Sequence, residues 1–172
     1  MTTKKRARSS DLLKFLSRYF SHPLRVGAVA PSSRYLARAM MEGIDFDSTR
    51  LIVEFGPGTG IFTDEIIARM HQECMLVTIE IDPHYAEYLR GKYHERSNVV
   101  VVEDSAGNLE PILDRYNLSD REVGAIVSGL PTPAIPKPDL TRMISSIRRN
   151  TETGAKFRMF TYAPSVMIPY YD

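Results

Sequence analysis

Three glycines at alternate positions, Gly56, Gly58 and Gly60, follow directly after a short apolar run that begins at Leu51. Val, Ile, Leu and Phe in that run favour a strand buried on both faces, and residues 61–70 repeat apolar side chains at helical spacing. The stretch therefore predicts a strand, a glycine turn and a helix. A turn of this kind lets bare backbone approach a ligand at the carboxyl end of a parallel sheet, where open α/β folds bind small molecules.

The charge of the ligand can be argued from the same residues. The dinucleotide fingerprint needs its third glycine at position 61, which is Ile61, and it holds an anionic pyrophosphate. Glu54 would place a carboxylate beside that anion. No Gly-Lys-Ser/Thr follows, so a P-loop is excluded. A cationic cofactor suits the turn better, and S-adenosylmethionine carries a sulfonium and an ammonium but no phosphate.

A second buried strand is predicted from Met75, and it reaches Glu80, which lies 20 positions after Gly60. An acidic side chain at the end of the second strand of such a unit can accept hydrogen bonds from both ribose hydroxyls. We assign that role to Glu80 and expect Ile81 to lie against the adenine. The plainer alternative is that Glu54 and Glu80 are ordinary carboxylates at strand ends. Their order and spacing favour the nucleotide-binding unit.

These two segments resemble the S-adenosylmethionine-dependent methyltransferases, in particular the branch that contains rRNA adenine dimethylases and bacterial phospholipid N-methyltransferases. The resemblance lies in Glu-x-Gly-x-Gly-x-Gly from Glu54 and in Ile-Glu-Ile-Asp-Pro from Ile79. It implies an α/β fold of the Rossmann-like class I type, with a doubly wound and mostly parallel sheet. It also implies S-adenosylhomocysteine as a product, and a cofactor site formed by Glu54, Gly56, Gly58, Gly60, Glu80 and Ile81.

Length and composition agree with one globular α/β domain, since the chain has 172 residues and a hydrophobic fraction of 43%. No apolar run reaches the roughly 18 residues of a membrane span, so none is predicted. The single Cys74 excludes an internal disulfide and fits a reducing cytoplasm. The four histidines show no metal-ligand spacing, and we assign no metal.

The formal net charge of +1 hides a strong asymmetry. Residues 1–40 contain nine basic side chains and one acidic side chain, a charge of +8, which leaves −7 on residues 41–172. Residues 10–20 predict an amphipathic basic helix whose leucine and aromatic side chains share one face. We therefore divide the single domain into a basic N-terminal helix and cap segment over 1–40 and a methyltransferase core over 41–172.

Three roles are open for this basic helix. On an anionic membrane each nearby Lys or Arg contributes roughly 1 kcal/mol, and the apolar face can enter the headgroup region. The same face can instead close over the cofactor as a lid, and these two roles are compatible. The third role is binding of nucleic acid. We favour contact with an anionic membrane surface, which predicts a cytoplasmic protein that is peripheral on the inner face of the membrane.

The segment over 21–33, Ser-His-Pro-Leu-Arg-Val-Gly-Ala-Val-Ala-Pro-Ser-Ser, closely resembles the corresponding part of the phospholipid N-methyltransferases. Its final Pro-Ser-Ser also predicts the start of a helix that ends near Met41. The resemblance places this segment over the cofactor, which makes Tyr19 and Tyr35 candidates to line the site. Each tyrosine can equally be a packing residue with a solvated hydroxyl.

A third strand, rich in valine, is predicted from Asn98 and ends at Asp104 and Ser105. In the families that the chain resembles, the acidic residue at this place accepts a hydrogen bond from the adenine amino group. The resemblance therefore assigns Asp104 to the cofactor, with Ser105 beside it. As an alternative, Asp104 caps the helix predicted over 108–116. One side chain can fill both roles.

The acceptor is expected after the next predicted strand, over 123–127, which runs into Ser-Gly-Leu-Pro-Thr. Methyltransferases that act on adenine carry Asn or Asp at the first of these positions and a base-stacking aromatic residue further on. Ser128 and Thr132 occupy those positions here, which disfavours nucleic acid as a partner. The stretch resembles the phospholipid branch instead. On this resemblance we assign to catalysis Ser128, Gly129, Leu130, Tyr19 and Tyr35.

Residues 139–150 predict a further helix, and residues 155–162 a further strand. The antiparallel seventh strand of such methyltransferases has no counterpart before Asp172. The predicted activity is transfer of methyl groups from S-adenosylmethionine to the headgroup amine of phosphatidylethanolamine, towards phosphatidylcholine. The alternatives are an rRNA adenine or small-molecule methyltransferase, and a module that binds cofactor and membrane without turnover.

Overall fold

The computed structural model describes residues 30–130 and 135–159, with side chains from residue 35. At its centre is a five-stranded sheet in the order β3-β2-β1-β4-β5, and every strand pair is parallel. The strands are β1 (Leu51–Phe55), β2 (Met75–Glu80), β3 (Val99–Glu103), β4 (Val123–Ser128) and β5 (Thr151–Met159). The helices are α2 (Ala30–Met40), α3 (Ile61–Ile67), α4 (Pro83–Lys92), the 3₁₀ helix η2 (Ala106–Asn108), α5 (Leu109–Arg115) and α6 (Lys137–Asn150).

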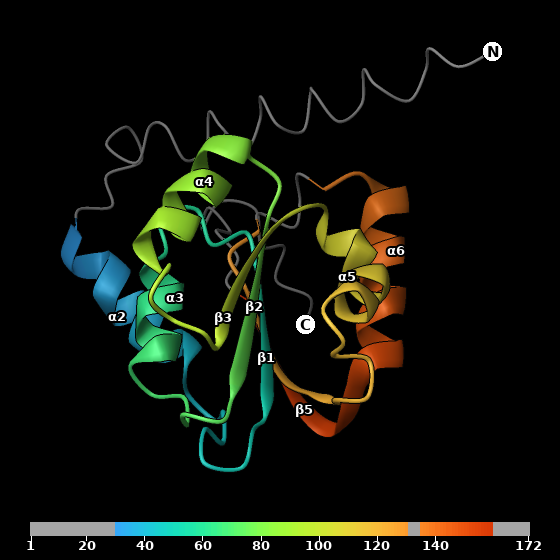
Figure 1. Cartoon of the computed structure of the whole chain (residues 1–172), viewed down its shortest axis with the longest axis horizontal. Helices are drawn as coiled ribbons and strands as arrows, with labels where there is room; N and C mark the ends of the chain where they lie inside the picture. The colour runs from blue at the N-terminus through green and yellow to red at the C-terminus, as the bar shows by residue number, and fades with distance from the viewer. Residues whose placement is uncertain (1–29, 131–134, 160–172) are drawn as a thin grey trace, which may run out of the picture.

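Helices cover both faces of the sheet (Figure 1). α2, α3 and α4 lie on one side, and α5 and α6 lie on the other. The chain winds outward from β1 through β2 to β3, and then returns to the opposite side of β1 for β4 and β5. This doubly wound parallel sheet confirms the predicted Rossmann-like class I fold. Because the strand order reverses between β1 and β4, their carboxyl ends form the place where such sheets bind ligands.

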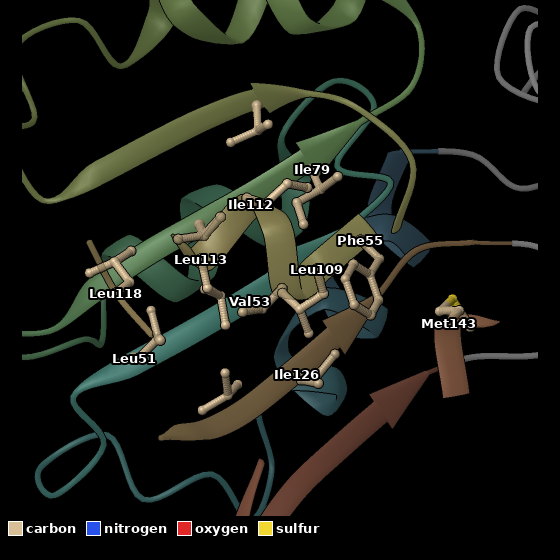
Figure 2. Packing of buried hydrophobic residues seen from close by; sticks show 13 residues of the cluster. Leu51, Val53, Phe55, Ile79, Leu109, Ile112, Leu113, Leu118, Ile126 and Met143 are labelled. Atoms are coloured by element: carbon tan, nitrogen blue, oxygen red, sulfur yellow. The ribbon is translucent and has the colours of Figure 1, made fainter. Parts of the chain in front are cut away.

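The central strands are apolar on both faces because both faces are covered. β1 alternates between two cores: Val53 and Phe55 pack on the side of α5 and α6, whereas Ile52 packs on the side of α2 and α3. Figure 2 shows the first core, in which Leu109 and Leu113 of α5 lie among the side chains of the strands. Helices packed on both faces thus fix the positions of the strand ends relative to one another.

Most of the predicted elements are present, with ends that differ by a few residues. The helix predicted over 61–70 ends at Ile67, and β5 begins at Thr151, before the strand predicted over 155–162. In β5, Gly154 has a φ of 92°, and the register with β4 shifts at this level. The irregular first residues of β5 carry no apolar pattern, so the sequence alone does not reveal them.

Some predictions concern residues outside the described part of the chain. These are the basic helix over 10–20, the site role of Tyr19 and the edge of the sheet beyond Met159. The boundary at residue 40 stays a prediction too, although Met40 of α2 is buried in the same core as Ile66 of α3. No helix within the described ranges is long and apolar enough to cross a membrane.

Candidate active site

A cavity opens where the carboxyl ends of β2, β3 and β4 meet α6. Apolar side chains form much of its wall, among them Ile81 after β2 and Leu130 after β4. Asp104 and Ser105, which follow β3, add polar groups to the wall. Three segments that are far apart in the sequence therefore converge here, and four of the predicted site residues share one cavity.

The glycine turn lies next to this cavity at the end of β1. All three of its glycines have positive φ, a conformation that side chains rarely adopt. A Cβ atom built on Gly56 would lie 2.4 Å from the end of the Leu130 side chain, so this residue, which follows β4, packs directly on the turn and would have to shift to admit a side chain there. The Gly129 amide donates to the Phe55 carbonyl at 2.8 Å. The glycine turn and residues 128–130 thus form one packed unit.

Glu80 connects β2 to the glycine turn. Its carboxylate is 3% exposed and accepts hydrogen bonds from the Gly58 amide at 3.0 Å and from the Asp82 amide at 2.9 Å. Burial raises the pKa of Glu80, and these backbone donors oppose that rise. Each carboxylate oxygen has a second lone-pair site, so the group can still accept from ribose hydroxyls. The ribose contact stays a prediction.

Glu54 is fully buried, and it differs from Glu80 in its hydrogen bonding. The Thr63 hydroxyl of α3 donates to Oε2 at 2.7 Å, whereas Oε1 makes no well-formed hydrogen bond with a described residue, although the Thr78 hydroxyl is near enough to lower the pKa of Glu54. Burial, with the nearby charge of Glu80, raises the pKa of Glu54 to about 8. An unpaired carboxylate oxygen in a closed interior is costly, which indicates that the site is built for a further donor or for a proton.

Asp104 has structural contacts as well as a place in the cavity wall. Its Oδ1 accepts from the Ser105 amide and from the Asn108 side chain, both at 2.7 Å. Arg115 approaches Oδ2 at 3.7 Å. The cap of η2 is Ser105, whose hydroxyl accepts from the Gly107 amide at 3.3 Å. Asp104 therefore stabilises the turn and lines the cavity, but the prediction that it caps the following helix is wrong, because the N-cap residue of α5 is Asn108. The adenine contact stays a prediction.

The catalytic residues predicted from the sequence are only partly brought together. Ser128, Gly129 and Leu130 lie beside the glycine turn, and the buried Ser128 hydroxyl accepts from the Leu130 amide at 3.4 Å. Tyr35 is 74% exposed on α2 and is not among the residues that line the cavity. Tyr19 lies outside the described residues. The catalytic roles of all five residues stay predictions.

A polar cluster that the sequence analysis did not identify lies behind the turn. The Tyr93 hydroxyl, at the end of α4, donates to Asp64 of α3 at 2.8 Å and lies 3.2 Å from the Gly60 carbonyl. Lys92 pairs with the same carboxylate at 2.7 Å. A Cβ atom built on Gly60 would lie 2.6 Å from the Tyr93 oxygen. The cluster thus fixes the end of the glycine turn. Its residues are far apart in the sequence, so no local sequence pattern connects them.

The family of ribosomal RNA adenine dimethylases matches residues 33–151, which is more than half of the chain. The chain belongs to this family of S-adenosylmethionine-dependent methyltransferases. Ornithine lipid N-methyltransferase of Singulisphaera acidiphila is 34% identical over 164 residues, which cover 94% of this methyltransferase and 83% of the relative. Ribosomal RNA small subunit methyltransferase A of Mycoplasma mycoides is 29% identical over 97 residues, which cover 56% of this chain and 34% of that protein.

Solved methyltransferase structures share the fold. Phosphoethanolamine N-methyltransferase 1 of Haemonchus contortus matches with a TM-score of 0.68 and 13% identity, over 99% of this chain and 37% of that chain. The 23S rRNA methyltransferase ErmE matches with a TM-score of 0.51 and 21% identity, over 78% of this chain and 46% of that chain. This methyltransferase thus spans less than half of either structure, and the likeness shows the fold alone.

The residues of the site fit the cofactor that the family implies. A largely apolar cavity whose wall carries two carboxylates, Asp104 and Asp139, suits an adenine ring with an exocyclic amino group. The buried oxygen of Glu54 without a partner suits a cationic donor. Within the described ranges, no group of three His, Cys, Asp or Glu side chains is placed to hold a metal ion.

Proposed function

We propose that this methyltransferase transfers a methyl group to the primary amine of a membrane-lipid headgroup. One observation carries the proposal: the similarity to ornithine lipid N-methyltransferase extends over 94% of the chain, whereas the similarity to the rRNA methyltransferase of Mycoplasma extends over 56%. Phosphatidylethanolamine, the substrate predicted from the sequence, presents the same reacting group as ornithine lipid, an aliphatic primary amine on a lipid. Both lipids are therefore candidate acceptors.

The acceptor segment supports an aliphatic amine over a planar base. Its sequence, Ser-Gly-Leu-Pro-Thr over 128–132, has no aromatic residue that could stack on a base. Residues 1–40 carry a charge of +8, which would attract an anionic membrane surface at roughly 1 kcal/mol for each nearby basic side chain. This is the basis for a peripheral position at the cytoplasmic face of the membrane.

The chemistry needs an uncharged amine in line with the sulfonium methyl group. When bound, the cofactor supplies this electrophilic methyl group. The amine would first lose a proton to solvent, and its lone pair would then form the C–N bond as the electrons of the C–S bond leave with sulfur. To Ser128, at the end of β4, we assign the role of orienting the amine through its carbonyl or hydroxyl oxygen. Leu130 packs against the glycine turn, and we expect it to help keep water from the reacting atoms, so that positioning and desolvation supply much of the rate.

Two other functions compete with this proposal. The family match favours an rRNA adenine methyltransferase, for which purified rRNA would be the acceptor. A module that binds cofactor and membrane without turnover would bind S-adenosylhomocysteine but transfer nothing. Neither competitor is expected to methylate lipid vesicles, so a single assay separates all three functions.

The assay uses radiolabelled S-adenosylmethionine with vesicles of anionic lipid that contain either phosphatidylethanolamine or ornithine lipid, and with rRNA in parallel. We expect label in one or both lipids by thin-layer chromatography, and none in RNA. Glu80→Gln should lose the activity, and Glu122→Gln, the same change at an exposed position, should retain it. Label in RNA alone, or in no acceptor despite cofactor binding, contradicts the proposal.

The role of the basic segment has a separate test. Deletion of residues 1–20 removes six of the nine basic side chains of residues 1–40, and with them much of the attraction to anionic lipid. We expect the truncated protein to sediment less with anionic vesicles than the full chain does, and both to sediment equally little with neutral vesicles. Equal sedimentation with anionic vesicles would contradict membrane contact through this segment.

A further inference from the structure

Three acidic residues lie at the carboxyl ends of three neighbouring strands. Asp104 follows β3, Glu80 ends β2 and Glu54 lies near the end of β1, so the strand order places them in a row. The cofactor has its adenine, ribose and amino-acid portion in a row of the same order. If Asp104 contacts the adenine and Glu80 the ribose, the cationic amino-acid end extends along the edge of the sheet towards Glu54.

Glu54 and Glu80 share one face of the sheet and have no cationic partner there. Glu54 is in register with Thr78, and Glu80 lies two residues further along β2, so both carboxylates face the side of α3. None of the ion pairs between described residues includes either of them. The interior beneath the glycine turn therefore holds two carboxylates and no positive side chain paired with them.

Each element that packs against Glu54 contributes groups to its surroundings. α3 contributes the Thr63 hydroxyl and the charge of Asp64, which itself pairs with Lys92 of α4. β2 contributes Glu80 and Thr78, and neither Thr78 Oγ1 nor Glu54 Oε1 has a partner in a well-formed hydrogen bond among the described residues.

The other neighbours of Glu54 offer no positive charge either. β4 contributes Val127, which is in register with Glu54 and apolar. Tyr93, which follows α4, is a neutral phenol whose pKa is raised mainly by burial and by its hydrogen bond to Asp64, with a smaller contribution from the charge of Glu54. An isolated carboxylate in such surroundings takes up a proton unless a cation arrives.

We propose that Glu54 carries a proton in the ligand-free protein and releases it when the ammonium-bearing end of the cofactor binds beside the glycine turn. The proton goes to solvent, and the carboxylate that forms accepts a hydrogen bond from the ammonium through the oxygen that lacks a partner. Glu54 is then a binding residue whose charge appears only with its ligand. The inference depends on the cofactor class and not on the acceptor, so failure of lipid methylation would leave it standing.

Calorimetric titration with S-adenosylhomocysteine at about pH 7 tests this directly. The product keeps the ammonium but cannot react, and the pH lies below the range of about 7.7 to 8.0 in which α-amino groups ordinarily titrate. Titrations in buffers of different ionisation enthalpy count the protons released. We expect close to one proton for the wild type and for Glu122→Gln, the matched exposed control, and none for Glu54→Gln. Adenosine, which lacks the ammonium, should release none.

The affinity should also follow pH with a definite sign. Since the ligand-free form binds one more proton than the complex, the affinity for S-adenosylhomocysteine rises with pH, by up to tenfold per pH unit, as pH approaches 8 from below. Glu54→Gln should flatten this rise. A wild-type protein that binds without releasing a proton overturns the proposal, as does equal release by Glu54→Gln or with adenosine.

Infrared difference spectroscopy keeps the proposal testable if Glu54→Gln does not fold. A buried carboxylic acid has a C=O stretch distinct from the bands of a carboxylate. In the wild-type protein we expect the acid band to disappear when S-adenosylhomocysteine is added. Persistence of that band in the complex would contradict proton release.

Discussion

The two faces of the sheet are built from the same strands but differ in chemistry. Towards α5 and α6 the strands present mostly apolar side chains, such as Val53 and Ile79, and the buried Ser128 lies at the end of β4. Towards α3 they begin apolar, at Ile52, and end in buried polar groups, Glu54 and Glu80. Buried polar groups cost free energy unless all of their hydrogen bonds are formed, so stability alone does not explain why Glu54 and Glu80 lie at this place. The comparison shows that the middle of both faces serves the fold, whereas the carboxyl ends carry the site: the cavity lies on the side of α6, and the two buried carboxylates lie on the side of α3.

The largest effect is expected from a change on the apolar face. Leu113 of α5 is 1% exposed in that core. Leu113→Ala should lower the free energy of unfolding by about 2–5 kcal/mol, because a large cavity is left in close-packed surroundings. Urea unfolding measures this loss. At temperatures where the variant is folded, its affinity for S-adenosylhomocysteine should match the wild type, and a weaker affinity would contradict the division between the two faces.

On the polar face, Glu80→Ala should act mainly on binding. The change removes the acceptor of the Gly58 and Asp82 amides as well as the predicted ribose contact. Since each hydrogen bond to a charged group contributes about 1.5–3 kcal/mol, we expect affinity for S-adenosylhomocysteine to fall on the order of 100-fold or more by calorimetry. Glu122→Ala serves as the exposed control. Unchanged affinity of Glu80→Ala would refute the ribose assignment.

Asp104→Ala separates the adenine contact from the structural contacts of the same side chain. Loss of one charged acceptor for the adenine amino group should weaken binding of adenosine and of S-adenosylhomocysteine about tenfold. The melting temperature should fall only modestly, because Ser105 still caps η2. A collapse of the melting temperature with little change in affinity would show instead that holding the turn is the main role of Asp104.

The smallest effect is expected behind the glycine turn. Tyr93→Phe removes the hydroxyl that donates to Asp64 near Gly60, at a cost of about 1 kcal/mol. We expect a loss of affinity of at most several-fold, with a small drop in melting temperature. Tyr88→Phe, the same change at a residue that is 54% exposed, should have no effect on either quantity. An equal effect of both variants would argue against a role for Tyr93 in fixing the turn.

Much of the fold follows from local sequence. Four of the five strands are apolar runs, β5 alternates apolar and basic residues from Ala155 to Met159, and the three glycines locate the turn, because these signals depend only on neighbouring residues. The Tyr93–Asp64 bond joins residues 29 positions apart, and the Thr63–Glu54 bond depends on how α3 packs on β1. Such contacts exist only in three dimensions, and so the sequence predicted the carboxylates of the site but not the groups that hold them.

A structure of the protein with S-adenosylhomocysteine bound is the most direct test of the site. The account predicts adenine in the cavity between Ile81 and Leu130 with its amino group on Asp104, the ribose hydroxyls on Glu80, and the ammonium next to Glu54. A nucleoside bound outside this cavity, or an amino-acid portion directed away from the glycine turn, would contradict it.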